Sequence, residues 1–116
     1  MKESGEAKLL RIFLGESERY KGVPVHEKIV LSAREHGLAG ATVIKGVMGF
    51  GRNSVIHTSK VLSLSEDLPI IIEIVDEIEK IEKFIPFINE IFETSNCAGL
   101  ITLEKVEVIK YTANKR

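Results

Sequence analysis

The sequence predicts one α+β domain in which two β-α-β units are separated by a long polar arm. Three observations support this prediction. Short aliphatic and β-branched runs alternate with two segments of helical periodicity. A chain of 116 residues is the size of a single domain with one hydrophobic core. A stretch containing three glycines marks the point at which regular structure is interrupted.

The first unit follows a short polar segment, residues 1–7, which we expect to be a flexible tail. Residues 8–15 (KLLRIFLG) alternate as in a buried strand. After a polar loop, Pro24 suits a first helical turn because its missing N–H costs nothing there. The helical pattern that starts at Val25 is expected to end at Gly37, since glycine readily adopts the left-handed conformation after a helix.

The second strand is predicted at residues 40–47 (GATVIKGV). Residues 49–66 then form the arm, in which the extended and polar-alternating part is typical of an exposed hairpin. Residues 69–76 (PIIIEIVD) predict a much stronger strand, with alternate isoleucines on one face. Its last residue, Asp76, is a candidate N-cap for the next helix.

The second helix is expected to bury one apolar stripe, made of Ile78, Ile81, Ile85, Ile88 and Phe92. Because Pro86 lies within this stripe, we predict a kink or a split near residue 85. Residues 96–99 (NCAG) then form a turn, and residues 100–111 form the last strand.

This element order makes a ferredoxin-like βαββαβ sandwich: an antiparallel sheet with both helices on one face and an extended arm between strands two and three. The helix-free face would be unusually apolar for a surface in water. Its expected residues on the first and third strands are Arg11, Phe13, Ile71, Glu73 and Val75. This pattern allows either ordinary surface hydrophobics or an oligomer interface, and we favour the interface.

Composition limits the classes of partner. The formal net charge is −1, so the chain has no strong field that would attract nucleic acid, and we expect no nucleic-acid binding. Cys97 is the only cysteine, which excludes an intrachain disulfide and suits a reducing compartment. No apolar run approaches the roughly 20 residues of a membrane span. We therefore expect a soluble, cytoplasmic protein without direct membrane insertion.

The segment GVMGFGRN (46–53) is the strongest candidate for chemistry. Its glycine spacing and position exclude a Rossmann fingerprint, and it lacks the Gly-Lys-Ser/Thr of a P-loop. An RNA-recognition module would need aromatic residues on the third strand, which has none. Two interpretations stay open: backbone N–H groups and Arg52 bind a phosphate, or the glycines only form a flexible hairpin root.

Catalytic and metal signatures are missing from the sequence. The three histidines, His26, His36 and His57, show no metal-ligand spacing. No serine or cysteine is accompanied by the base and the orienting acid that nucleophilic catalysis needs. We therefore expect neither an enzyme nor a metal site.

The phrases VMGFGRNSVIHT (47–58) and LPIIIEIVD (68–76) resemble PII signal-transduction proteins, from the GFGR motif through the long T-loop to the following strand. The longer phrases GVPVHEKIV, EHGLAGATVIKGVMGFG and LSEDLPIIIEIVD are more similar still to a PII-like family of unknown function. The resemblance covers nearly the whole chain. It implies a homotrimer with inward-facing sheets, an adenine nucleotide (ADP, AMP or ATP) in clefts between subunits, and a sensor rather than an enzyme.

The resemblance also implies individual roles. The residues matching the nucleotide-binding motif at the arm root are Gly49, Phe50, Gly51, Arg52 and Asn53, with Asn53 in place of the family's Gln. Ser54, His57 and Lys60 on the arm would contact a target protein, such as a transporter. The family's second glycine-rich loop should lie near residues 95–101, but SNCAGLI has one glycine and no lysine there. A mono- or diphosphate is therefore easier to accommodate than a triphosphate.

The leading hypothesis is a trimeric PII-like regulator that binds an adenine nucleotide between subunits and signals through residues 49–66. Two alternatives remain open. One is a trimeric protein-interaction module that needs no nucleotide, and the other is a metal-binding protein similar to CutA.

Overall fold

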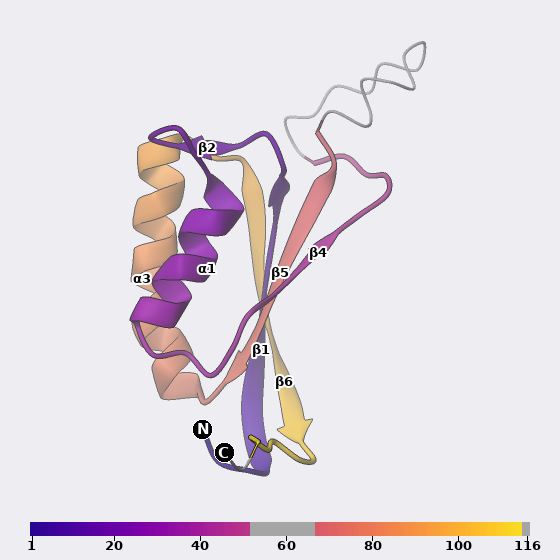
Figure 1. Cartoon of the computed structure of the whole chain (residues 1–116), viewed down its shortest axis with the longest axis vertical. Coiled ribbons are helices and arrows are strands. Elements are labelled where there is room, and N and C mark those ends of the chain that lie inside the picture. The colour runs from indigo at the N-terminus through magenta and orange to yellow at the C-terminus, as the bar shows by residue number, and fades with distance from the viewer. Residues whose placement is uncertain (52–66, 115–116) are drawn as a thin grey trace.

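The computed structural model describes residues 1–51 and 67–114, and its elements carry the labels of Figure 1. Their bounds are β1 Gly5–Gly15, β2 Arg19–Tyr20, β3 Val23–Pro24, α1 Val25–Glu35, β4 Thr42–Lys45, β5 Pro69–Asp76, α3 Ile78–Ser95 and β6 Gly99–Val108. The described residues form a four-stranded antiparallel sheet in the order β4-β5-β1-β6 and a small β2-β3 hairpin. Both helices cover the same side of the sheet (Figure 1). The predicted α+β ferredoxin-like sandwich is confirmed.

The core lies between the helices and one face of the sheet. Alternate residues of the two central strands, including Leu10, Ile12, Ile72 and Ile74, have exposed fractions of 1% or less. The alternation predicted for β5 is confirmed, with the bounds that its sequence indicated. Aliphatic side chains at every second position give a strand one fully buried face, which here is the helix-covered face.

Helix α1 starts directly after Pro24, which occupies the N-cap and not the first turn. It ends at Glu35, and Gly37 follows with a φ of 75°. The predicted role of Gly37 is therefore confirmed, because only glycine adopts this left-handed conformation at little cost.

Helix α3 corrects the predicted stripe. Its buried residues are Ile81, Phe84, Ile88 and Ile91, whereas Ile78, Ile85 and Phe92 are only partly buried. Of the kink or split predicted near residue 85, the split is wrong, since the helix runs without interruption through Pro86. Pro86 is exposed, so its ring points away from the core.

Asp76 is not the N-cap of α3, as predicted from the sequence, because Glu77 occupies that position. Asp76 is instead the last residue of β5 and is 2% exposed. Its Oδ1 accepts a hydrogen bond from the Glu77 N–H at 2.7 Å, and its Oδ2 accepts one from the Ala39 N–H at 2.8 Å. This carboxylate therefore ties the loop after α1 to the start of α3.

Other boundaries differ by a few residues. Strand β1 begins at Gly5, so the last residues of the expected 1–7 tail belong to the sheet. Strand β4 is limited to Thr42–Lys45, and β6 ends at Val108. Residues 52–66, most of the predicted arm, lie outside the described residues. Within residues 1–51 and 67–114, no helix is long and apolar enough to span a lipid bilayer.

Candidate functional site

The arm leaves the sheet from a base formed by the ends of β1, β4 and β5. The Glu16 N–H donates to the Leu68 carbonyl at 2.9 Å, and the Ser17 N–H donates to Asp67 Oδ1 at 3.0 Å. Lys45 Nζ lies 2.5 Å from Glu16 Oε2. These contacts fix both chain segments that lead into the arm.

Two glycines at this base pack against one proline ring. A Cβ atom at Gly46 would lie 2.7 Å from Pro69 Cγ, and one at Gly49 would lie 3.1 Å from the same atom. The Gly46 N–H also donates to the Pro69 carbonyl at 2.8 Å. Close packing on Pro69 is therefore a reason for glycine at position 46 that is independent of any phosphate, and it is a weaker reason at position 49.

The predicted nucleotide residues divide between described and undescribed parts of the chain. Gly49, Phe50 and Gly51 lie in the described segment that follows β4. Arg52 and Asn53, together with the predicted partner-binding residues Ser54, His57 and Lys60, lie outside the described residues.

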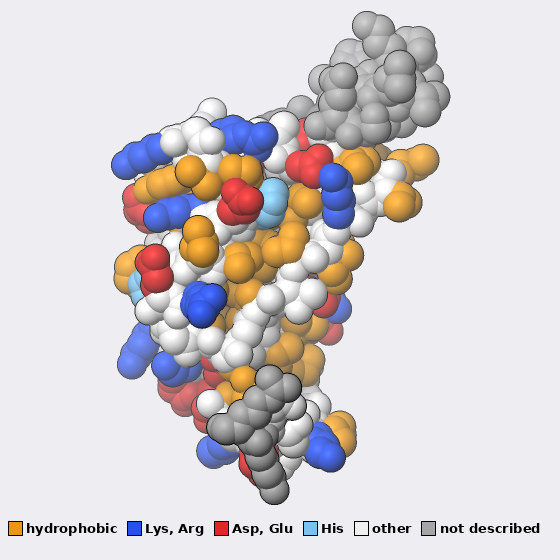
Figure 2. All heavy atoms as spheres, in the orientation of Figure 1, with side chains coloured by type: hydrophobic (Ala, Val, Ile, Leu, Met, Phe, Trp, Pro, Cys, Tyr) orange, Lys and Arg blue, Asp and Glu red, His pale blue; other side chains and the backbone are white. Residues whose placement is uncertain are grey.

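Apolar side chains in this segment are unusually exposed. Val47 is 93% exposed, and Met48 and Phe50 are each 73% exposed. Figure 2 shows hydrophobic side chains gathered on the loop after β4. Contiguous exposed apolar groups of this kind mark interaction surfaces.

The turn before β6 is contacted by a carboxylate, that of Glu18. The Ala98 N–H donates to Glu18 Oε2 at 3.0 Å. Burial, together with the negative charge of Glu18, raises the pKa of the Cys97 thiol to about 12. The thiol is therefore neutral near pH 7, and this turn offers no positive charge to a phosphate.

The helix-free face of the sheet is organised in rows that cross all four strands. Strand register places Ile44, Ile71, Phe13 and Leu100 side by side, and we call this set the apolar row. A second row lies two residues away from the apolar row on every strand, on the same side of it. In this row the register aligns Thr42, Glu73, Arg11 and Thr102, and we call it the polar row. The outer members of the apolar row, Ile44 and Leu100, are 42% and 56% exposed.

The polar row is held together by Arg11. Its Nε donates to Glu73 Oε2 at 2.7 Å, and it also pairs with Glu104 on β6. The hydrogen bond to Glu73, with the nearby charge of Glu104, raises the pKa of Arg11 above its usual value. The three charged groups thus bridge β5, β1 and β6 and largely satisfy one another.

A hollow of about 440 Å³ lies beside the polar row, and we call it the sheet hollow. Its sheet side includes Leu9, Arg11, Thr42, Glu73 and Val75. The remaining wall comes from the N-terminus, the loop before β4, the end of β6 and the segment after it: Met1, Ala39, Gly40, Ala41, Val108, Lys110 and Tyr111. An apolar lining with a few polar groups is typical of small-molecule sites.

Sequence reasoning identified Arg11, Glu73 and Val75 as members of the helix-free face but did not identify this hollow. Its walls depend on strand register and on the return of the C-terminal segment. The only sign of the hollow in the sequence was the occurrence of charged and hydroxyl residues, such as Arg11, Thr42 and Glu73, at alternate strand positions.

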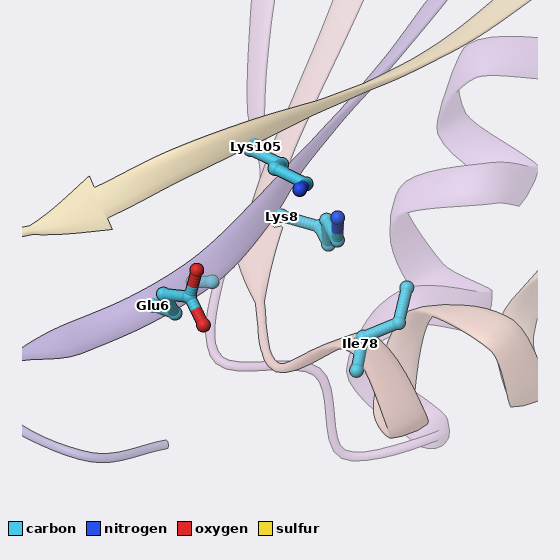
Figure 3. A pocket seen from close by; sticks show the side chains of 5 residues that line it. Glu6, Lys8, Ile78 and Lys105 are labelled. Atoms are coloured by element: carbon cyan, nitrogen blue, oxygen red, sulfur yellow. The ribbon is translucent and has the colours of Figure 1, made fainter.

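A second hollow, of about 330 Å³, lies near the start of α3 and is lined by Glu6, Ala7, Lys8, Ile78 and Lys105. Figure 3 shows the Lys8 and Lys105 side chains extending toward the same space. The register places Glu6 opposite Glu107 and Lys8 opposite Lys105, so adjacent lysine and glutamate pairs balance in charge. We assign no ligand to this hollow.

Metal ligands are not clustered in the described part of the chain. Within residues 1–51 and 67–114, no three His, Cys, Asp or Glu side chains are placed to hold a metal ion.

Comparison with protein families gives one match that spans most of the chain. Residues 7–108 match the family model DUF190, described as Uncharacterized ACR, COG1993. A UPF0166 protein of Aquifex aeolicus is 45% identical over 102 residues, covering 88% of this chain and 92% of the relative. A UPF0166 protein of Methanocaldococcus jannaschii is 34% identical over 105 residues, covering 90% and 94%.

Solved structures with the same fold are PII-like proteins. CPII of Thiomonas intermedia, bound to ADP, AMP and bicarbonate, superimposes with a TM-score of 0.66 at 17% identity, covering 91% of each chain. A putative PII-like signalling protein of Thermus thermophilus gives a TM-score of 0.64 at 16% identity, covering 93% of this chain and 94% of its own. The predicted family relationship is confirmed.

Proposed function

Because the chain belongs to the DUF190 (UPF0166) family and has the PII-like fold, we propose that it is a trimeric regulator. In this proposal it binds an adenine nucleotide between subunits and signals nucleotide occupancy through residues 49–66 to a target protein. The proposed role is binding and not catalysis, because Arg11 and Glu73 at the sheet hollow are paired with each other.

The sheet hollow is the observation that carries the proposal. Its volume of about 440 Å³ is within the usual range for small-molecule sites, and Leu9, Val75 and Val108 give it an apolar side. Thr42 and the Arg11–Glu73 pair supply polar groups beside that side. We place the base of the nucleotide here, on the same fold that holds ADP and AMP in CPII.

The phosphates are assigned to the arm root, where Gly49, Phe50 and Gly51 precede Arg52 and Asn53. A guanidinium forms bidentate hydrogen bonds with phosphate oxygens, so Arg52 is the principal phosphate ligand in this proposal. The Glu18 carboxylate at the turn before β6 disfavours a third phosphate, and we therefore propose ADP or AMP ahead of ATP.

The trimer is proposed from the apolar row. Ile44 and Leu100 at its two ends are half exposed in the single chain, and the segment after β4 adds Val47 and Met48. Association through this face would remove these groups from water, which is favourable in proportion to the apolar area covered. The adjacent sheet hollow would then lie beside a subunit boundary.

Calorimetry with ADP, AMP and ATP tests the nucleotide site, with light scattering for the oligomer. We expect ADP or AMP to bind the wild-type trimer and Arg52→Ala to weaken binding about tenfold or more, since a charged hydrogen-bond pair is lost. Arg34→Ala, on the exposed side of α1, is the matched control and should bind as the wild type does.

The possible results separate the two leading functions. A trimer that binds none of the three nucleotides would contradict the nucleotide proposal. It would favour a protein-interaction module that uses the exposed Val47, Met48 and Phe50. A monomer that binds nucleotide would contradict the proposed trimer alone.

A further inference from the structure

Tyr111 joins parts of the chain that are distant in sequence. Its backbone N–H donates to the Glu3 carbonyl at 2.8 Å, and its hydroxyl donates to the Ala39 carbonyl at 3.0 Å. Figure 1 shows the two termini side by side at the end of the sheet opposite the loop after β4. The segment after β6 is therefore held against both the N-terminal segment and the loop before β4.

These two hydrogen bonds place the Tyr111 side chain in the wall of the sheet hollow. The side chain is 40% exposed, so it is fixed at its hydroxyl end without being enclosed in the core. The loop that receives the hydroxyl bond, Ala39–Gly40–Ala41, has only small side chains and also lines the hollow. A Cβ atom added at Gly40 would meet nothing within 4 Å, which shows that space is open on this side.

The chemistry of this wall fits a flat aromatic ligand. Bases stack on aromatic side chains with little dependence on sequence, because every base presents a π-face. Among the residues lining the sheet hollow, Tyr111 is the aromatic one, while Leu9, Val75 and Val108 are aliphatic. Lys110 lies next to it in the same wall and carries a positive charge.

We propose that Tyr111 is the base-stacking wall of the nucleotide site: its ring stacks on the base, and its hydroxyl bond to Ala39 fixes the ring. The proposal rests on the nucleotide site proposed above. It assigns the C-terminal segment, and not only the arm root, to ligand recognition. Tyr111 should therefore affect binding of the base and leave binding of the phosphates unchanged.

Tyrosine fluorescence offers a direct measurement, because the chain has no tryptophan and only two tyrosines, Tyr20 and Tyr111. Tyr20 lies on β2 with Lys21 and Lys28 over its ring, and it packs partly against the core. A Tyr20→Phe variant leaves Tyr111 as the sole emitter. We expect ADP to quench this emission saturably, at the concentrations where calorimetry detects binding, whereas a Tyr111→Phe variant should show no saturable quenching.

Calorimetry of Tyr111 variants separates stacking from a structural role. Tyr111→Ala should weaken ADP binding about tenfold or more, but pyrophosphate and ribose 5-phosphate should bind as they do to the wild type. Tyr111→Phe keeps the ring and loses only the hydroxyl bond, so its ADP affinity should fall no more than about threefold.

Each contrary result has a distinct meaning. If ADP binds by calorimetry but leaves Tyr111 emission unchanged, or if Tyr111→Ala weakens pyrophosphate and ADP equally, the assignment of Tyr111 is overturned and the nucleotide site stands. If the wild type binds no nucleotide, the nucleotide site fails and the assignment of Tyr111 fails with it.

Discussion

The two faces of the sheet are built from alternate residues of the same strands, yet only one face is complete in a single chain. On the helix-covered face, Ile72 of β5 has an exposed fraction of 0%. On the opposite face its neighbour Ile71 is partly exposed, and the ends of the apolar row are 42% and 56% exposed. The helices bury the central strands on the first face, and no helix of the described residues covers the second.

The difference shows where function can reside in so small a domain. Between the helices and the central strands, the helix-covered face is filled by apolar side chains. The helix-free face instead carries the Arg11–Glu73–Glu104 cluster, the sheet hollow and the apolar row. One set of strand positions thus encodes the fold, and the proposed association and binding both use the alternate set.

The largest expected effect is on the oligomeric state, and it comes from a charge placed in the apolar row. In Leu100→Asp, each subunit of the trimer would bury an unpaired carboxylate, and such burial costs several kcal/mol per ion. We expect the mass measured by light scattering to fall from trimer to monomer, with the circular dichroism spectrum unchanged.

Leu103→Asp is the matched control, because Leu103 lies on the other face of β6 and is 43% exposed, close to the 56% of Leu100. It should remain trimeric. A trimeric Leu100→Asp protein would show that the apolar row is not the interface.

Truncation in the core should give the next largest effect. Ile72→Ala removes a fully buried side chain, so the free energy of unfolding should fall by about 2–5 kcal/mol. Ile71→Ala is the control from the opposite face and should cost less than half as much. Both substitutions are best compared by urea unfolding in the monomeric Leu100→Asp background. Equal losses at the two positions would contradict the difference between the faces.

Much of the fold could be predicted because its strands follow simple alternation. The isoleucines of β5 gave both its bounds and its buried face. The α3 stripe was less determined, since apolar residues at 78, 81, 84, 85, 88, 91 and 92 form a stripe about 140° wide, broader than the face that is fully buried. Which of them are buried depends on where α1 and the sheet lie, and periodicity alone does not contain that information.

The site was less predictable than the fold. Glycines near an arginine drew attention to the arm root, but the sheet hollow depends on strand register. It also depends on the hydrogen bond between Tyr111 and Ala39, which are 72 positions apart in sequence. Local patterns contain no signal for such a contact. The glycines themselves were ambiguous because close packing and phosphate binding both favour a residue without a side chain.

Gly46→Ala resolves that ambiguity and carries the smallest expected effect. The new Cβ would lie 2.7 Å from Pro69 Cγ, and overpacking of this kind costs about 1–3 kcal/mol. Pro69→Ala removes the Cγ atom, so the double variant Gly46→Ala/Pro69→Ala should be more stable in urea unfolding than the sum of the two single effects. Gly40→Ala, where the Cβ meets open space, should change the free energy of unfolding by no more than about 0.5 kcal/mol. If Gly46 instead serves the phosphate, Gly46→Ala will weaken ADP binding without loss of stability, and removing the proline ring will not restore it.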